Sequence, residues 1–128
     1  MKVLETARND ILNIIGAMKP TKNTTVVHRN VRIDDILPHY NLNDTVDFKI
    51  ISSTSAVPSD PGYDFYRYEI TIPKNGLVLE LDQFDSFVRN ENGEILLPPM
   101  KCKVENIRNS TENCKGVIEL EYLEKLPC

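Results

Sequence analysis

The sequence reads Glu94-Ile95-Leu96-Leu97-Pro98-Pro99 at its most informative point. This hydrophobic run begins with a carboxylate and follows the turn-forming pair Asn92-Gly93, so it indicates a short strand entered through a turn. A carboxylate at the first position of such a strand is held rigidly while its head group can point into a cleft. Taken alone, Glu94 can also be a solvent-facing residue that flanks a strand.

Short strands separated by turns extend in both directions from this segment. Apolar and β-branched residues predict strands over 24–31, 48–54, 66–72, 77–81, 94–97, 101–107 and 117–123. The segments between them are rich in Pro, Gly, Asn, Asp and Ser, which favour turns. No helical pattern lies between the later strands to form a parallel crossover, so the sequence predicts an α+β or mostly-β fold.

One amphipathic helix is predicted ahead of the strands. The apolar residues on its stripe are Leu4, Ile11, Ile14, Ile15 and Met18. The predicted helix therefore covers residues 1–19 and ends before Pro20. Residues 33–37 allow only a helical turn or two before Pro38.

Length and composition limit the classes of protein that this chain can be. A chain of 128 residues is expected to form a single domain, 1–128, with one core. Apolar residues make up 41% and charged residues 27%, as in globular proteins, and no segment has the length of a membrane span or the layout of a signal peptide. Synthesis in the cytoplasm without a membrane partner is expected. The net charge of −4 argues against a nucleic-acid partner held by phosphate neutralisation.

The cysteines carry no recognisable motif. Cys102, Cys114 and Cys128 are odd in number and lack CxxC spacing. The pattern therefore predicts neither a disulfide framework nor a zinc site. One disulfide between two of these cysteines remains an alternative if the chain is exported.

Two further polar features interrupt strands. Arg29 lies in an apolar strand with Val27 and Val31 as its neighbours on the same face. An arginine on a buried face needs an anion, although an edge-strand arginine in a salt bridge fits the same pattern. The run Ser52-Ser53-Thr54-Ser55 closes another predicted strand, where its hydroxyls can orient a carboxylate or begin a loop.

Taken together and in order, these features resemble the mono-ADP-ribosyltransferases of the arginine–serine–glutamate clade, which includes bacterial binary toxins and vertebrate ecto-transferases. That family has an arginine on an early strand, a Ser-Thr-Ser at a strand end and a catalytic glutamate running into a Leu-Leu-Pro strand. The chain supplies Val27-His28-Arg29, Ser53-Thr54-Ser55 and Glu94-Ile95-Leu96-Leu97-Pro98-Pro99. The spacing of serine and glutamate is similar to the family's, and the resemblance covers about residues 24–124.

The resemblance implies a split β-sandwich whose cleft holds NAD, with an N-terminal layer reduced to one helix over about 1–19. Arg29 would bind phosphates of NAD, since its planar charged fork suits paired oxygens. Ser53 would hydrogen-bond Glu94, and Thr54 and Ser55 belong to the same NAD-binding motif. Glu94 would hold the nicotinamide-side ribose and stabilise the cation that forms as nicotinamide leaves, which requires no metal.

The segment after the serine motif is where relatives place an aromatic that stacks on nicotinamide and a further basic contact to the phosphates. Phe65 and Arg67 are similar in position, with Tyr63 as a substitute for the aromatic. A core position for Phe65 and a solvent-facing Arg67 fit the sequence equally well.

The sequence departs from the family pattern two positions before the glutamate. Relatives carry Glu or Gln there, whereas this chain has Asn92, which can hydrogen-bond an acceptor but cannot remove a proton. Phe87 lies in the loop where relatives recognise their targets, so Asn92 and Phe87 are the predicted acceptor-side residues. The short N-terminal layer leaves room for an activating partner or a further segment that completes the cleft.

The implied function is an NAD-dependent mono-ADP-ribosyltransferase that transfers ADP-ribose to a macromolecule, in the first place a protein, and releases nicotinamide. NAD is its co-substrate, and the relatives imply an effector or toxin-like role in a host cell. Two alternatives stay open. An NAD glycohydrolase would use water as the acceptor, and a degenerate copy of the fold would bind NAD or a protein without turnover.

Overall fold

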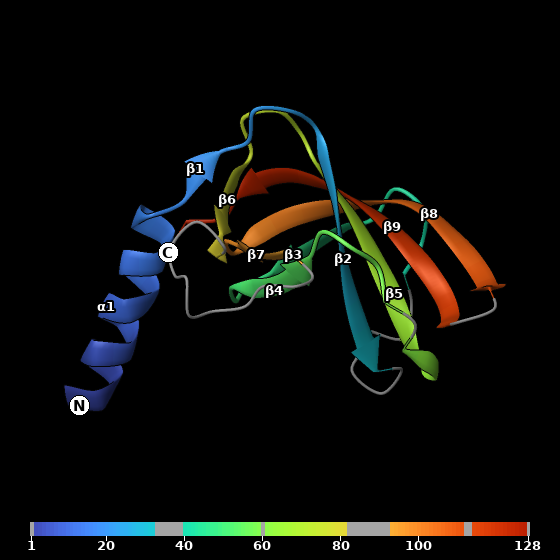
Figure 1. Ribbon diagram of the computed structural model, residues 1–128, viewed down its shortest axis with the longest axis horizontal. Coiled ribbons are helices and arrows are strands. Elements are labelled where there is room, and N and C mark those ends of the chain that lie inside the picture. The colour runs from blue at the N-terminus through green and yellow to red at the C-terminus, as the bar shows by residue number, and fades with distance from the viewer. Residues whose placement is uncertain (1, 33–39, 60, 82–92, 112–113, 128) are drawn as a thin grey trace.

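The computed structural model describes residues 2–32, 40–59, 61–81, 93–111 and 114–127. Within them the chain forms helix α1 (Lys2–Gly16) and nine strands (Figure 1). The strands are β1 (Lys19–Pro20), β2 (Thr25–Arg32), β3 (Thr45–Phe48), β4 (Ser52–Ser55), β5 (Gly62–Ile72), β6 (Leu77–Glu80), β7 (Glu94–Leu97), β8 (Met100–Thr111) and β9 (Cys114–Lys125).

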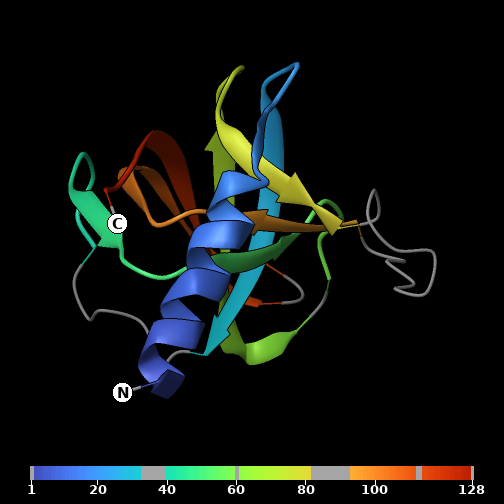
Figure 2. The same cartoon turned by 90° about the vertical axis from the view of Figure 1, so that its left-hand side faces the viewer.

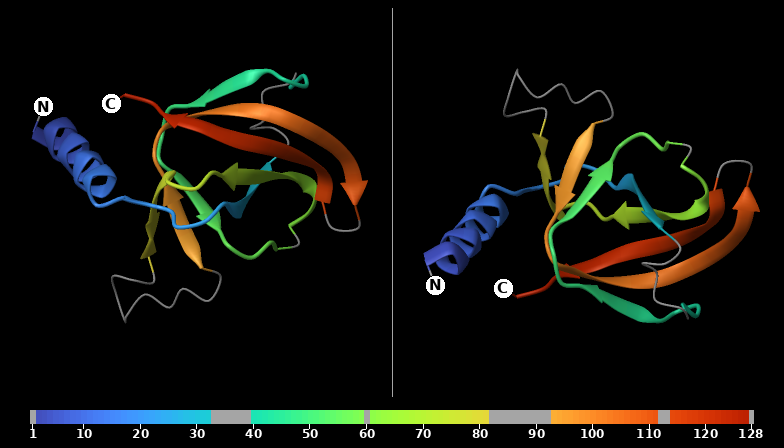
Figure 3. Two further views of the ribbon diagram at one scale, coloured as in Figure 1. Left: turned by 90° about the horizontal axis from the view of Figure 1, so that it is seen from above. Right: turned by 90° about the horizontal axis from the view of Figure 1, so that it is seen from below.

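The strands form one hydrogen-bonded series that divides into two parts. The order is β1-β6-β7-β4-β2-β5-β9-β8-β3. β2 and β4 are joined by a single pair, His28 opposite Ser55, whereas β2 and β5 pair from Thr25 to Arg32. The sheet therefore splits between β4 and β2, and Figure 3 shows the two parts diverging from there. The predicted split β-sandwich is confirmed.

The core lies between the two parts because alternate residues of the strands are apolar on one face. In β5, Tyr68, Ile70 and Ile72 are buried, whereas the intervening residues are charged or polar. The other buried members of this cluster are Val27, Val78, Ile95, Leu97, Met100, Cys102, Val104, Ile118, Leu120 and Tyr122. β5 and β9 pair in parallel, and the described part of the chain between them runs through strands β6, β7 and β8 rather than through a crossover helix.

The C-terminal end of helix α1 packs against the smaller part of the sheet, and the helix extends away from it toward the N-terminus (Figure 1 and Figure 2). Ile15 and Met18 are buried against Leu79, and Leu96 of β7 borders this second cluster. Ile11, which the sequence places on the same stripe, is 44% exposed, so the described packing comes from the end of the helix. The helix ends at Gly16 rather than at residue 19, since Lys19 and Pro20 pair with β6. The reduced helical layer is confirmed.

The prediction of one strand over 48–54 is wrong. β3 pairs with β8 at one edge of the larger part, whereas β4 pairs with β7 in the smaller part. The apolar residues between them cross from one part to the other, and Ile50 is 68% exposed. A local pattern cannot distinguish such a crossing from a continuous strand. The helical turn predicted over 33–37 lies outside the described residues.

The described cysteines are buried thiols. Cys102 lies on β8, Cys114 lies on β9 with its thiol donating to the Gly116 carbonyl at 3.4 Å, and Cys128 lies outside the described residues. Burial raises the pKa of the Cys102 thiol to about 12, so it is protonated at neutral pH. In the described part of the chain no helix is long and apolar enough to cross a membrane, and no cluster of metal-binding side chains occurs.

Candidate active site

A hydrogen bond joins two of the predicted residues across β4 and β7. The strands are antiparallel, with Ser55 opposite Glu94 and Ser53 opposite Leu96. Ser53, Ser55 and Glu94 therefore share a face, and the Ser53 hydroxyl donates to Glu94 Oε1 at 2.8 Å. This contact restricts the glutamate side chain to one orientation.

Thr54 lies on the opposite face of β4. It is only 3% exposed, and its hydroxyl donates to the carbonyl of Ile95 at 2.7 Å. Successive side chains of the serine motif thus lie on opposite faces of β4. Ser53 and Ser55 border the outer face, whereas Thr54, which the resemblance includes among the NAD-binding residues, is packed toward the core.

The turn before Glu94 is also restricted. Gly93 has φ of +63°, in the left-handed region that favours glycine. Its carbonyl accepts a hydrogen bond from Ala56 N at 2.9 Å, which continues the β4–β7 pairing beyond the strands. The conformation of Gly93 therefore determines where Glu94 enters β7.

Gly93→Ala is expected to lower the free energy of unfolding by about 1–2 kcal/mol, because an alanine at positive φ is strained. The added Cβ would also lie 3.0 Å from the Cβ of Ala56. Urea denaturation measures the change. The matched control is Gly16→Ala, whose Cβ meets nothing within 4 Å, and it should not destabilise. Equal stability of the Gly93 variant and the native chain would contradict this account.

A pocket of about 350 Å³ opens where β2 and β4 part. Its lining consists of His28, Arg29 and Asn30 from β2, Ser53 and Ser55 from β4, and Val57 and Ser59 from the segment that follows. Two predicted residues, Arg29 and Ser53, thus border one pocket, and Glu94 adjoins it through its hydrogen bond with Ser53. Another pocket of about 340 Å³, between the end of α1, β1 and β6, contains none of the predicted residues.

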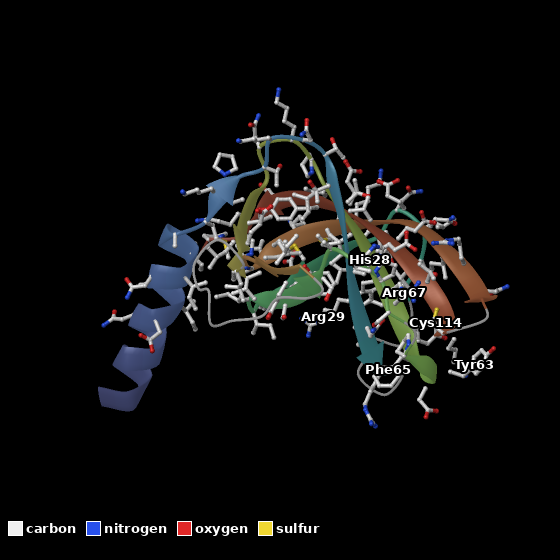
Figure 4. The ribbon with its side chains drawn as sticks, viewed as in Figure 1. His28, Arg29, Tyr63, Phe65, Arg67 and Cys114 are labelled. Atoms are coloured by element: carbon white, nitrogen blue, oxygen red, sulfur yellow. The ribbon has the colours of Figure 1, made fainter. Side chains whose placement is uncertain are left out.

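Arg29 borders the pocket from the core face of β2. It pairs with Tyr68 of β5 and alternates with buried Val27, whereas His28 faces the side of Ser55. Figure 4 shows Arg29 on the β4 side of β2 and Arg67 on the other. His28, Arg29 and Asn30 all line the pocket, beside the single pair that joins β2 to β4.

The charge of Arg29 has no carboxylate partner among the ion pairs of the described residues. Its neighbour Tyr68 cannot serve as an anion. Burial raises the pKa of Tyr68, its hydrogen bond with Tyr40 (2.8 Å) raises it further, and Arg29 only partly opposes them. The tyrosine therefore stays neutral at physiological pH. The described residues therefore supply no anion for Arg29.

Arg67 and Asn30 both hydrogen-bond Ser59. Arg67 donates to the Ser59 carbonyl, and Asn30 Nδ2 donates to Ser59 Oγ at 2.7 Å. Nearby, burial lowers the pKa of His28, which Glu69 opposes, so the imidazole is mostly neutral at pH 7. Arg67, predicted as a phosphate contact, is thus engaged with the wall of the pocket and is not among the residues that line it.

Phe65 is also outside the lining of this pocket. It pairs with Arg32 across β2 and β5, and the Arg32 guanidinium lies 5.5 Å from the centroid of its ring. One face of the predicted nicotinamide-stacking ring is therefore covered by a cation. Tyr63, the substitute, is 61% exposed at the start of β5. The predicted acceptor-side residues Asn92 and Phe87 lie outside the described residues.

Sequence reasoning did not identify Asn30 and Ser59. Asn30 directly follows Arg29 and interrupts the apolar strand, which is a signal similar to that of the arginine. Ser59 lies in a turn-rich segment where serines are common, so nothing in the sequence distinguishes it.

No protein-family model and no curated protein matches the sequence. Solved structures match along most of the chain. C3stau2 from S. aureus, in a structure with NAD, has a TM-score of 0.74 at 17% identity, covering 97% of this chain and 72% of that one. Plx2a, an ADP-ribosyltransferase toxin from Paenibacillus larvae, has a TM-score of 0.71 at 19% identity, covering 91% and 70%. The enzymatic component C2-I of the Clostridium botulinum C2-toxin has a TM-score of 0.74 at 17% identity, covering 97% and 37%.

The chain has the ADP-ribosyltransferase fold. The resemblance drawn from the three motifs is thus confirmed at the level of the fold. In this ADP-ribosyltransferase fold, Arg29, Ser53 and Glu94 come from three strands that are consecutive in the sheet order, with β2 on one side of the split and β4 and β7 on the other. The chain spans 37% of the length of C2-I, so much of that toxin component has no counterpart here.

Proposed function

We propose that this chain is an NAD-dependent mono-ADP-ribosyltransferase that transfers ADP-ribose from NAD to a protein or another macromolecule. The observation that carries the proposal is the 2.8 Å hydrogen bond between Ser53 and Glu94, beside a pocket that Arg29 also borders. The likeness of the fold to ADP-ribosylating toxins supports it.

The pocket fits part of NAD. Its volume of about 350 Å³ is near the lower end of small-molecule sites, which begin at about 300 Å³. We infer that it takes the nicotinamide and its ribose, while the rest of the dinucleotide lies outside. Arg29 would hold a phosphate oxygen at the rim, since its permanent charge and planar fork suit phosphates.

Glu94 would act on the ribose. When the bond between ribose C1′ and the nicotinamide nitrogen breaks, its electron pair leaves with nicotinamide and C1′ becomes cationic. A fixed carboxylate beside the ribose stabilises that cation more than the ground state. A nucleophile of the acceptor then bonds to C1′ and loses its proton to solvent or a base. Ser53 keeps the carboxylate oriented, so little reorganisation is needed during the reaction.

The experiment that tests the proposal is nicotinamide release from NAD, measured with and without a cell lysate. Release that rises with lysate, together with labelled macromolecules, supports the transferase and supplies the acceptor for mass spectrometry. A folded protein that releases no nicotinamide, with lysate as a source of an activating partner, would contradict it.

An NAD glycohydrolase is the second candidate, because of Asn92. This residue stands where relatives carry Glu or Gln, and an amide cannot deprotonate an acceptor side chain. Water would then attack C1′. Nicotinamide release that lysate does not raise and that labels no macromolecule would favour this activity.

Ser53→Ala is expected to lower kcat for nicotinamide release about tenfold or slightly more, the scale of one hydrogen bond to a charged group. Glu94 keeps its charge in this variant but loses the contact that orients it. Ser55→Ala, on the same face of β4, is the matched control and should change kcat less. An unchanged kcat in Ser53→Ala would show that the hydrogen bond does not orient the carboxylate during turnover.

A further inference from the structure

One wall of the pocket is held by side chains of the other sheet part. Val57 and Ser59 line the pocket on the segment that follows β4. Asn30 of β2 donates to the Ser59 hydroxyl at 2.7 Å, and Arg67 of β5 donates to the Ser59 carbonyl. Both hydrogen bonds cross the split between β4 and β2, so they connect the segment that follows β4 to β2 and β5.

The rest of this wall has few attachments. Its first residue, Ala56, is held by the backbone hydrogen bond to Gly93 at 2.9 Å. Val57 is 55% exposed, and no hydrogen bond to Val57 or Pro58 occurs among the described residues. The described contacts of this segment therefore lie at its two ends, and those at Ser59 come from side chains.

We propose that Asn30 is a positioning residue that sets the affinity of the pocket for NAD by holding Ser59, an inference that rests on the proposed function. When the hydrogen bond is lost, the wall spends part of its time away from the binding conformation. The apparent dissociation constant for NAD then equals the intrinsic value divided by the fraction of molecules whose wall is in the binding conformation. Glu94 and Ser53 are held independently through β4 and β7, so kcat stays the same.

Two variants remove the same hydrogen bond from its two sides. Asn30→Ala removes the donor, and Ser59→Ala removes the acceptor, whereas Ser59→Thr keeps a hydroxyl at that position. The matched control is Asn106→Ala, which removes an asparagine hydrogen bond of 2.8 Å to Glu119 on β8 and β9, away from the pocket.

The kinetic test separates KM from kcat in nicotinamide release. Asn30→Ala and Ser59→Ala should each raise KM for NAD about three- to tenfold, on the scale of one hydrogen bond, with kcat within about twofold. The double variant should be no worse than either single variant, because both remove one interaction. Ser59→Thr should recover most of the affinity that Ser59→Ala loses, and Asn106→Ala should behave as the native protein. A loss in kcat at constant KM, or additive effects, would overturn the proposal.

Backbone ¹⁵N relaxation tests the same contact without NAD. In Asn30→Ala the order parameters of the Val57 and Ser59 amides should fall toward about 0.6, the range of flexible backbone, while Asn106→Ala leaves them unchanged. Unchanged order parameters in Asn30→Ala would overturn the role of Asn30 whether or not the protein acts on NAD. Lower order parameters in a native fold that neither binds NAD nor releases nicotinamide would reject the proposed function and the link to affinity, whereas the contact between Asn30 and Ser59 would still restrict the segment.

Discussion

Glu94→Gln is expected to lower nicotinamide release from NAD by about 10²-fold or more, the scale measured for preorganised electrostatic groups. Glutamine has nearly the same shape and keeps an oxygen that can accept the hydrogen bond from Ser53, now 2.8 Å from Oε1. The variant therefore removes the charge and exchanges one acceptor oxygen for an amide donor while keeping the shape, so the cationic ribose loses its stabilising partner. Release is measured at saturating NAD, so that the loss appears in kcat.

The control for this substitution is Glu124→Gln. Glu124 is an exposed carboxylate on β9 whose contact with Lys101 is 4.0 Å, so the substitution changes the net charge equally while leaving the site intact. Both variants should unfold at nearly the native temperature. Native release by Glu94→Gln would exclude Glu94 as the group that stabilises the ribose cation, and with it the proposed mechanism.

Arg29→Ala is expected to raise the dissociation constant for NAD about 10- to 100-fold, the scale of a hydrogen bond to a charged group. The guanidinium borders the pocket with Ser53 and has no carboxylate partner among the ion pairs of the described residues. Its charge is thus available for a phosphate. Arg29→Lys should recover only part of the affinity, because an ammonium cannot bind two oxygens as a planar fork does. Isothermal titration calorimetry with NAD measures both variants.

Arg32→Ala is the matched control on the same strand. Arg32 is exposed and its guanidinium lies over Phe65, so its loss changes the net charge equally without touching the pocket. A similar loss of affinity in both variants would indicate a general electrostatic effect, which higher salt would weaken. Unchanged affinity in Arg29→Ala would remove Arg29 from the site.

Much of this fold could be predicted because the bounds of its elements depend on local sequence patterns. The strand Glu94–Leu97 has the predicted bounds, since a turn containing Gly93 precedes it and two prolines follow it. The prediction of one strand over 48–54 was wrong because it too depended on a local pattern. An apolar run indicates extended backbone, but it does not show that the chain changes from one sheet part to the other within it.

The sequence by itself determined which residues are the candidates for the chemistry. Arg29 interrupts an apolar strand, the hydroxyl run with Ser53 closes one, and Glu94 begins one. Polar side chains at such positions are visible in the sequence because burial disfavours them. Their order along the chain was enough to name the fold that the structure then confirmed.

The tertiary structure alone decided which of these groups meet. Ser53 reaches Glu94 because the β4–β7 register places them on one face, and Arg29 borders the same pocket because β2 and β4 share only one pair. The engagement of Asn30 with Ser59 depends on the same split. Contacts between distant segments follow from strand register and from the angle at which sheets part, and these are set by packing of the whole core rather than by any local stretch of sequence.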